Sequence, residues 1–138
     1  MAYHDIAPVR SPRPYQSMSL NQLLSWADII TLHCSMALDG PHKAIMGQKE
    51  IRLMKKSSWL VNGSRGELVD EAALLEALKE KHLAGAALDV FAREPYNGPL
   101  RELSNIILTP HIGSYAQEAR ILMENEAVEN LIQGLKTI

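Results

Sequence analysis

Three side chains that could bind an anion or move a proton stand far apart in the sequence: Arg65, Glu94 and His111. A forked guanidinium suits a carboxylate or a polarised carbonyl. An imidazole exchanges protons near neutral pH, and a carboxylate bonded to one of its nitrogens fixes the tautomer. Each residue also has a simpler interpretation: a packing or capping histidine, a solvated loop acid, or an arginine that pairs with Glu67.

The segments around these residues alternate between short apolar runs and helical patterns. Helix starts are indicated by capping-box pairs at Ser19–Gln22 and Ser114–Gln117 and by a capping Asp70. The apolar runs are nearly continuous rather than alternating, so they predict an α/β fold: a parallel sheet with helices on both faces. The expected strands are 29–33, 58–63, 85–91 and 106–109, with a short edge strand near 15–18.

Ligands bind beyond the carboxyl ends of the strands in open parallel sheets. Polar residues follow four of the expected strands, and Glu94 lies in the loop after the third. We therefore expect an anion clamp and an acid/base pair on one rim of the sheet. The residues at these strand ends are His33, Cys34 and Ser35, then Asn62, Gly63, Ser64 and Arg65, then Asp89, then His111.

Composition narrows the class of protein. The 138 residues suffice for one domain, and a net charge of −2 argues against a nucleic-acid partner. The single cysteine, Cys34, excludes an internal disulfide framework, and no apolar run is long enough to span a membrane. The amino-terminal residues lack a signal-peptide pattern, so a cytoplasmic protein without a metal site is expected.

Three stretches together resemble a known family. "VNGSRGELVDEAALLEAL", "GAALDVFAREP" and "LTPHIGS", in this order and spacing, are similar to the D-isomer-specific 2-hydroxyacid dehydrogenases. That family includes phosphoglycerate, glyoxylate/hydroxypyruvate and D-lactate dehydrogenases. The resemblance covers nearly the whole chain. It implies a Rossmann-like NAD-binding domain, with hydride transfer between nicotinamide and a D-2-hydroxy acid or 2-keto acid.

The resemblance also implies roles for particular residues. Arg65 would hold the substrate carboxylate and polarise its carbonyl, Glu94 would pair with His111, and His111 would be the acid/base. Asp5 would bond the adenosine ribose hydroxyls, and an acid there favours NAD over NADP because it repels a 2′-phosphate. Asp89 would lie near the nicotinamide carboxamide. The other implied NAD contacts are His33, Cys34, Ser35, Ser64 and Gly113.

The chain departs from the family pattern in three ways. The family has a strand and a G-x-G-x-x-G loop upstream of "MAYHD", but the eight glycines here never follow that spacing. The family's substrate domain is absent, and Ser35 stands where a proline is usual. Residues 1–138 are therefore expected to form a partial dinucleotide-binding domain, a Rossmann-like sheet that lacks its first strand.

These departures have predicted consequences. Without the Gly-rich loop, NAD binding should be weak or absent, and without a closed cleft turnover by this chain alone is not expected. The strand at 29–33 should have a free apolar edge, which predicts a homo-oligomer, unless the amino-terminal strand is displaced into the gap. Two alternatives to an oxidoreductase remain: a non-catalytic dinucleotide-sensing module, like the family's co-repressor relatives, and an inert fragment.

Overall fold

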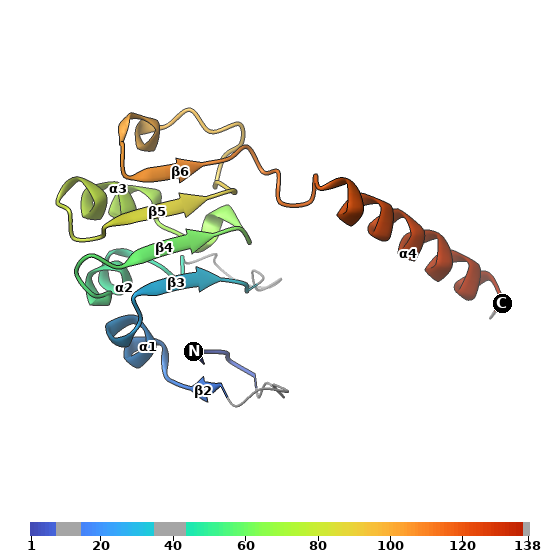
Figure 1. Cartoon of the computed structure of the whole chain (residues 1–138), viewed down its shortest axis with the longest axis horizontal. Coiled ribbons are helices and arrows are strands. Elements are labelled where there is room, and N and C mark those ends of the chain that lie inside the picture. The colour runs from blue at the N-terminus through green and yellow to red at the C-terminus, as the bar shows by residue number, and fades with distance from the viewer. Residues whose placement is uncertain (8–14, 35–43, 137–138) are drawn as a thin grey trace.

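A four-stranded parallel sheet forms the centre of the molecule. The computed structural model describes residues 1–7, 15–34 and 44–136. The sheet order is β3 (Ile29–Leu32), β4 (Trp59–Asn62), β5 (Gly85–Leu88) and β6 (Ile106–Leu108), with every neighbouring pair parallel (Figure 1). The carboxyl ends of all four strands therefore meet at one edge of the sheet. The prediction of an α/β fold with a parallel sheet is confirmed.

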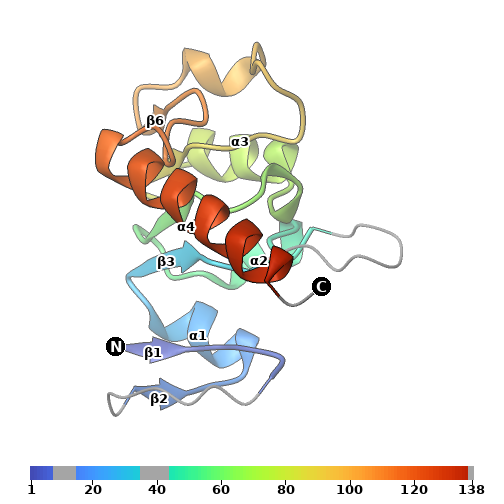
Figure 2. The same ribbon diagram turned by 90° about the vertical axis from the view of Figure 1, so that its right-hand side faces the viewer.

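A separate two-stranded sheet lies beyond β3. It pairs β1 (Ala2–Tyr3) with β2 (Gln16–Ser17) in parallel, which confirms the short strand expected near residues 15–18. In both views β1 is on the side nearer to β3, and β2 is farther away (Figures 1 and 2). No described residue pairs with the outer edge of β3, so the two sheets remain separate in the part of the chain that the structure describes.

Three helices pack side by side on one face of the main sheet: α1 (Leu20–Trp26), α2 (Gln48–Leu53) and α3 (Glu71–Lys79). The predicted capping box starts α1, because Ser19 and Gln22 bond reciprocally to each other's backbone N–H groups. At α3 the Asp70 carboxylate accepts from the N–H groups of Ala72 and Ala73, as a capping residue should.

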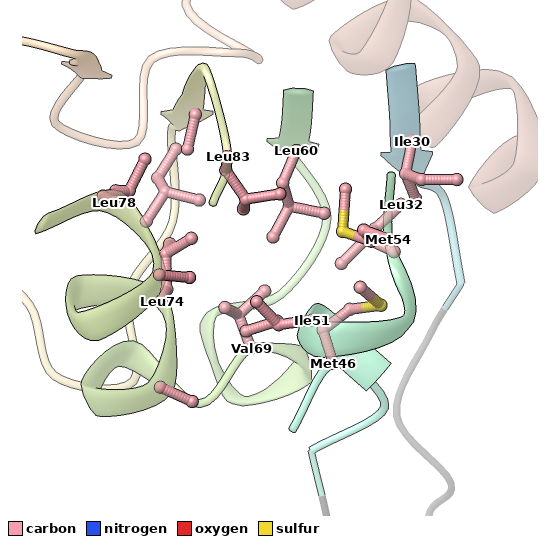
Figure 3. Packing of buried hydrophobic residues seen from close by; sticks show 14 of the residues in the cluster. Ile30, Leu32, Met46, Ile51, Met54, Leu60, Val69, Leu74, Leu78 and Leu83 are labelled. Carbon is pink, nitrogen blue, oxygen red and sulfur yellow. The ribbon is translucent and has the colours of Figure 1, made fainter. Parts of the chain in front are cut away.

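The core lies between these helices and every second strand residue (Figure 3). Leu60, in the centre of β4, is completely buried, and Ile30 and Leu32 contribute from β3. Burying one such side chain stabilises the fold by about 1.5–3 kcal/mol. The helix and loop residues that meet them are Met46, Ile51, Met54, Val69, Leu74, Leu78 and Leu83.

The flanking helices follow the prediction, but in the described residues they pack on one face of the sheet and the second face is open. On the second face Ile29 is 63% exposed, Trp59 40% and Ile107 61%. β3 and β4 therefore alternate between buried and more exposed residues instead of being buried throughout. The physical reason is that α4 (Gln117–Leu135), the remaining helix, runs away from the sheet and buries none of its residues (Figure 1).

The start of α4 also differs from the prediction. Its N-cap is Ala116 and no side chain caps it, so the expected capping box of Ser114 and Gln117 does not form. The residues just before the helix instead form a turn, in which the Tyr115 N–H donates to the Ile112 carbonyl at 2.9 Å. In the described residues no helix is long and apolar enough to cross a membrane.

Candidate active site

The turn after β4 is organised by a buried amide. Asn62 is 1% exposed; its Nδ2 donates to the Arg65 carbonyl at 2.8 Å, and its Oδ1 accepts from the Ser64 N–H at 3.1 Å. The Ser64 hydroxyl donates to the Cys34 carbonyl at 2.6 Å and so ties this turn to the end of β3. Arg65 is thereby held at the rim, where its Nη1 donates to the Ser64 carbonyl at 2.7 Å.

The loop after β5 holds Glu94 against the same rim. Its Oε1 accepts from the Phe91 N–H at 3.0 Å, and the Phe91 ring stacks on Tyr96 with centroids 4.4 Å apart. This loop lies directly against the short 3₁₀ helix η1 (Gly66–Leu68), since a Cβ on Gly66 would come within 1.9 Å of the Phe91 carbonyl carbon. Close backbone packing therefore brings the turn after β4 to the loop after β5.

His111 and Glu94 form a direct pair, 17 residues apart in sequence. The distance from His111 Nδ1 to Glu94 Oε2 is 2.9 Å. The hydrogen bond from His111, together with the one from the Phe91 backbone, holds the pKa of Glu94 below its usual range. An ionised carboxylate can only accept, so Nδ1 must carry the proton, and Nε2 is left to bind or exchange a proton elsewhere.

A pocket of about 270 Å³ opens between these loops. It is close to the lower limit of about 300 Å³ for small-molecule sites, so it suits a ligand of few atoms. Its walls bring together the three candidate side chains from three strand ends. The lining residues are Arg65, Gly66, Glu67, Val90, Phe91, Ala92, Glu94 and His111.

The remaining predicted residues are spread along the carboxyl edge. Asp89 follows β5, and its Oδ2 accepts from the Gly113 N–H at 2.8 Å, so these two are in direct contact. His33 follows β3, and its Nε2 lies 3.0 Å from the Thr31 hydroxyl. Asp5 follows β1 and accepts from the Ala7 N–H at 2.8 Å, outside the pocket. Ser35 lies outside the described residues.

Two functional contacts are not evident from the sequence. The sequence places Asn62 among the polar strand ends, but it does not reveal that the Asn62 amide shapes the turn that carries Arg65. It also does not reveal that the Phe91 N–H donates to the second oxygen of Glu94. A polar residue at the last position of an apolar strand, directly before a glycine, is the signal that indicates such a turn. In the described residues no group of three His, Cys, Asp or Glu side chains is placed to hold a metal ion.

The residues present fit one half of a dinucleotide better than the other. Ser64, Cys34 and Asp89 stand at adjacent strand ends, where a nicotinamide ring could lie. A diphosphate needs converging backbone N–H groups at a helix start. The helix that follows β4 begins instead with Asp70, whose carboxylate already accepts the first free N–H groups.

A parallel sheet with polar groups gathered at its carboxyl edge is typical of α/β proteins that bind ligands at the strand ends. Comparison with known proteins makes this specific. Residues 1–113 match the family model "D-isomer specific 2-hydroxyacid dehydrogenase, NAD binding domain". The chain belongs to this family.

Individual relatives agree with the family. The chain is 46% identical over 125 residues to D-3-phosphoglycerate dehydrogenase of Escherichia coli, covering 86% of this chain and 30% of that protein. It is 48% identical over 115 residues to glyoxylate reductase of Thermococcus litoralis, covering 83% and 34%. The chain thus spans about a third of the length of these curated relatives.

Solved structures share the fold. The TT0316 protein of Thermus thermophilus superimposes with a TM-score of 0.87 at 40% identity, covering 99% of this chain and 43% of that one. The NAD-complexed D-isomer specific 2-hydroxyacid dehydrogenase of Lactobacillus delbrueckii gives a TM-score of 0.83 at 30% identity, covering 96% and 45%.

Proposed function

We propose that this chain is part of an NAD-dependent oxidoreductase that transfers hydride between nicotinamide and a D-2-hydroxy acid or 2-keto acid, of the phosphoglycerate, glyoxylate or hydroxypyruvate type. The observation that carries the proposal is the small pocket lined by Arg65, Glu94 and His111, in which Glu94 holds Nδ1 of His111 and leaves Nε2 available. Family membership and the two relatives named above support the reaction class.

Each side chain then has a role that follows from its chemistry. Arg65 binds the substrate carboxylate and polarises the carbonyl through its fork of N–H donors. His111 gives a proton from Nε2 to the carbonyl oxygen during reduction and removes it from the hydroxyl during oxidation. Glu94 keeps the imidazole in the tautomer that this exchange requires. The nicotinamide, when bound, supplies or accepts the hydride at the substrate carbon.

Turnover by this chain alone is not part of the proposal. His111 is 50% exposed and Glu94 37%, so water reaches the pocket from one side. Hydride transfer is favoured in a cleft that excludes water. The matched region is only 30% and 34% of the length of the two curated relatives.

The first experiment is an NADH titration of this chain, following energy transfer from Trp26 and Trp59 to the nicotinamide, with Asp5→Ala as the comparison. Saturable binding that is weakened in the variant supports the predicted contact of Asp5 with the adenosine ribose. Loss of NADH absorbance on adding hydroxypyruvate supports an oxidoreductase, whereas a full-length form of the protein that binds NADH without reducing hydroxypyruvate favours a sensing module. Absence of binding at millimolar NADH contradicts a dinucleotide site in this chain and favours an inert fragment.

We also propose that the chain self-associates through the free edge of β3. Among the described residues this edge has no strand partner, and Ile29 at its start is 63% exposed. An unpaired apolar edge tends to pair with another chain. Light scattering should then give the mass of a dimer or a larger oligomer, and a monodisperse monomer contradicts the proposal.

A further inference from the structure

Both carboxylate oxygens of Asp89 are used by the segment that carries His111. Oδ1 accepts from the Thr109 hydroxyl at 2.5 Å and from the Ile112 N–H at 2.9 Å, and Oδ2 accepts from the Gly113 N–H at 2.8 Å. The donors lie on both sides of His111 in the sequence. Three of the roughly four lone-pair sites of a carboxylate are thus filled within the chain.

Asp89 is itself held firmly to the sheet. Its own N–H donates to the Asn62 carbonyl at 2.9 Å, which extends the pairing of β5 with β4. The Thr109 N–H donates to the Leu88 carbonyl at 3.0 Å on the other side. Partial burial opposes ionisation of Asp89, but the hydrogen bonds from Thr109, Ile112 and Gly113 outweigh it, and its pKa lies below the usual value.

The backbone of His111 has an unusual conformation that needs such support. Its φ is 56°, in the left-handed region that a residue with a side chain rarely adopts. This conformation turns the next two N–H groups, of Ile112 and Gly113, toward one carboxylate. If His111 relaxed to a negative φ, the peptide plane would rotate and these donors would leave Asp89.

We propose that Asp89 is a positioning residue for His111: its carboxylate holds residues 109–113 in the turn that directs Nδ1 at Glu94 and leaves Nε2 for the substrate. The importance of this for catalysis rests on the proposed function, but the positioning itself does not. Asp89 acts through the backbone and need not touch the reacting atoms. The fourth lone-pair site remains available to a nicotinamide carboxamide, so a cofactor contact is compatible with it.

Two substitutions separate geometry from charge. Asp89→Asn keeps the size but removes the charge and turns an NH₂ group toward the N–H donors. Asp89→Glu keeps the charge but lengthens the side chain by one methylene. Positioning by geometry predicts that both variants lose the His111–Glu94 bond, whereas an effect of charge alone predicts loss only in Asp89→Asn.

The readout is the imidazole ¹⁵N spectrum of this chain labelled at histidine, recorded without NADH in mildly alkaline buffer. The parent chain should show His111 as the Nδ1–H tautomer. Both Asp89 variants should lose this tautomer in favour of the mixture of an unrestrained imidazole. Glu94→Gln, which removes the carboxylate acceptor of Nδ1, identifies the His111 signals.

Asp70→Asn is the matched control. Asp70 also accepts from two backbone N–H groups, but at the start of α3, so this variant makes the same change of charge without touching the turn at 109–113. Its His111 spectrum should equal that of the parent chain. If the Asp89 variants do not fold, Thr109→Val removes a single donor and should give a partial loss that Thr109→Ser restores.

The proposal is overturned if folded Asp89→Asn and Asp89→Glu keep the Nδ1–H tautomer, or if Asp89→Glu alone keeps it. It is also overturned if Asp70→Asn changes the His111 signals as much as the Asp89 variants do. Because no cofactor is present, failure of the chain to bind NADH would contradict the proposed function while leaving this result intact.

Discussion

Replacing Gly66 by alanine is the sharpest test of how the site is assembled. An added Cβ would lie 1.9 Å from the Phe91 carbonyl carbon, 2.2 Å from its oxygen and 2.3 Å from the Ala92 nitrogen. Ordinary contacts between heavy atoms are about 3.5–4.0 Å, so η1 and the loop after β5 must separate by more than about 1 Å. All three atoms belong to the backbone and cannot rotate away. We expect the free energy of unfolding to fall by about 3 kcal/mol, the upper end for overpacking.

The assay is urea unfolding of Gly66→Ala, followed by tryptophan emission, with Gly63→Ala as the matched control. Gly63 lies three residues earlier in the same turn, and an added Cβ there meets nothing within 4 Å. Its substitution should change stability by less than about 1 kcal/mol, with stabilisation the expected sign, because alanine restricts the unfolded chain. The amide signal of Phe91, which donates to Glu94, should move only in Gly66→Ala.

Equal stability of Gly66→Ala and the parent chain, with an unmoved Phe91 amide, would refute the close packing of η1 against this loop. A large loss in Gly63→Ala would also refute the reasoning, because it would show that the turn tolerates no side chain whether or not space is available. Only a large difference between the two variants supports backbone packing as the feature that brings Arg65 to the pocket.

Three further predictions concern a cap, a helix and a titration. Asp70→Ala should lower the free energy of unfolding by about 1 kcal/mol in urea titrations, because it leaves the N–H groups of Ala72 and Ala73 without their acceptor. Gly134→Ala should raise the helical signal in circular dichroism, since the position is open and glycine costs a helix about 1 kcal/mol relative to alanine. Because the pKa of Glu94 is lowered in the fold, its ionised form stabilises the protein above its ordinary pKa of about 4.3, and this contribution is lost as the pH falls through the lowered value. Glu94→Gln should therefore be less stable than the parent chain at neutral pH, and the two should converge in acid.

Local patterns predicted those parts of the fold that local physics determines. The Ser19–Gln22 capping box and the Asp70 cap form because each depends on a few consecutive residues. The parallel order of the sheet followed from strands separated by helices. The polar strand ends predicted the pocket because parallel strands bring such ends to one edge.

The exposure of a strand or helix, and the backbone conformation of a turn, depend on which distant segment packs against it. A local sequence pattern does not identify that segment. Ile29 and Trp59 belong to apolar strands, yet they are exposed because no described helix covers the second face. The apolar residues of α4 also remain exposed, because no described segment packs against this helix. Ile121, Leu122 and Met123 are examples. The turn at His111 depends on Asp89, 22 residues earlier, so no local pattern could predict its positive φ.

The three pocket residues and Asp5 lie in different sheets, so the geometry of the pocket and the binding of a dinucleotide depend on different parts of the chain. Arg65, Glu94 and His111 follow β4, β5 and β6, three adjacent strands that pair with one another without a gap. Asp5 follows β1, which belongs to the separate sheet. The pocket therefore needs nothing from β1 or β2 to hold its geometry, whereas a dinucleotide that reaches Asp5 must bridge the two sheets. Weak NADH binding should for this reason coexist with an intact His111–Glu94 pair, and the two properties should respond to different substitutions.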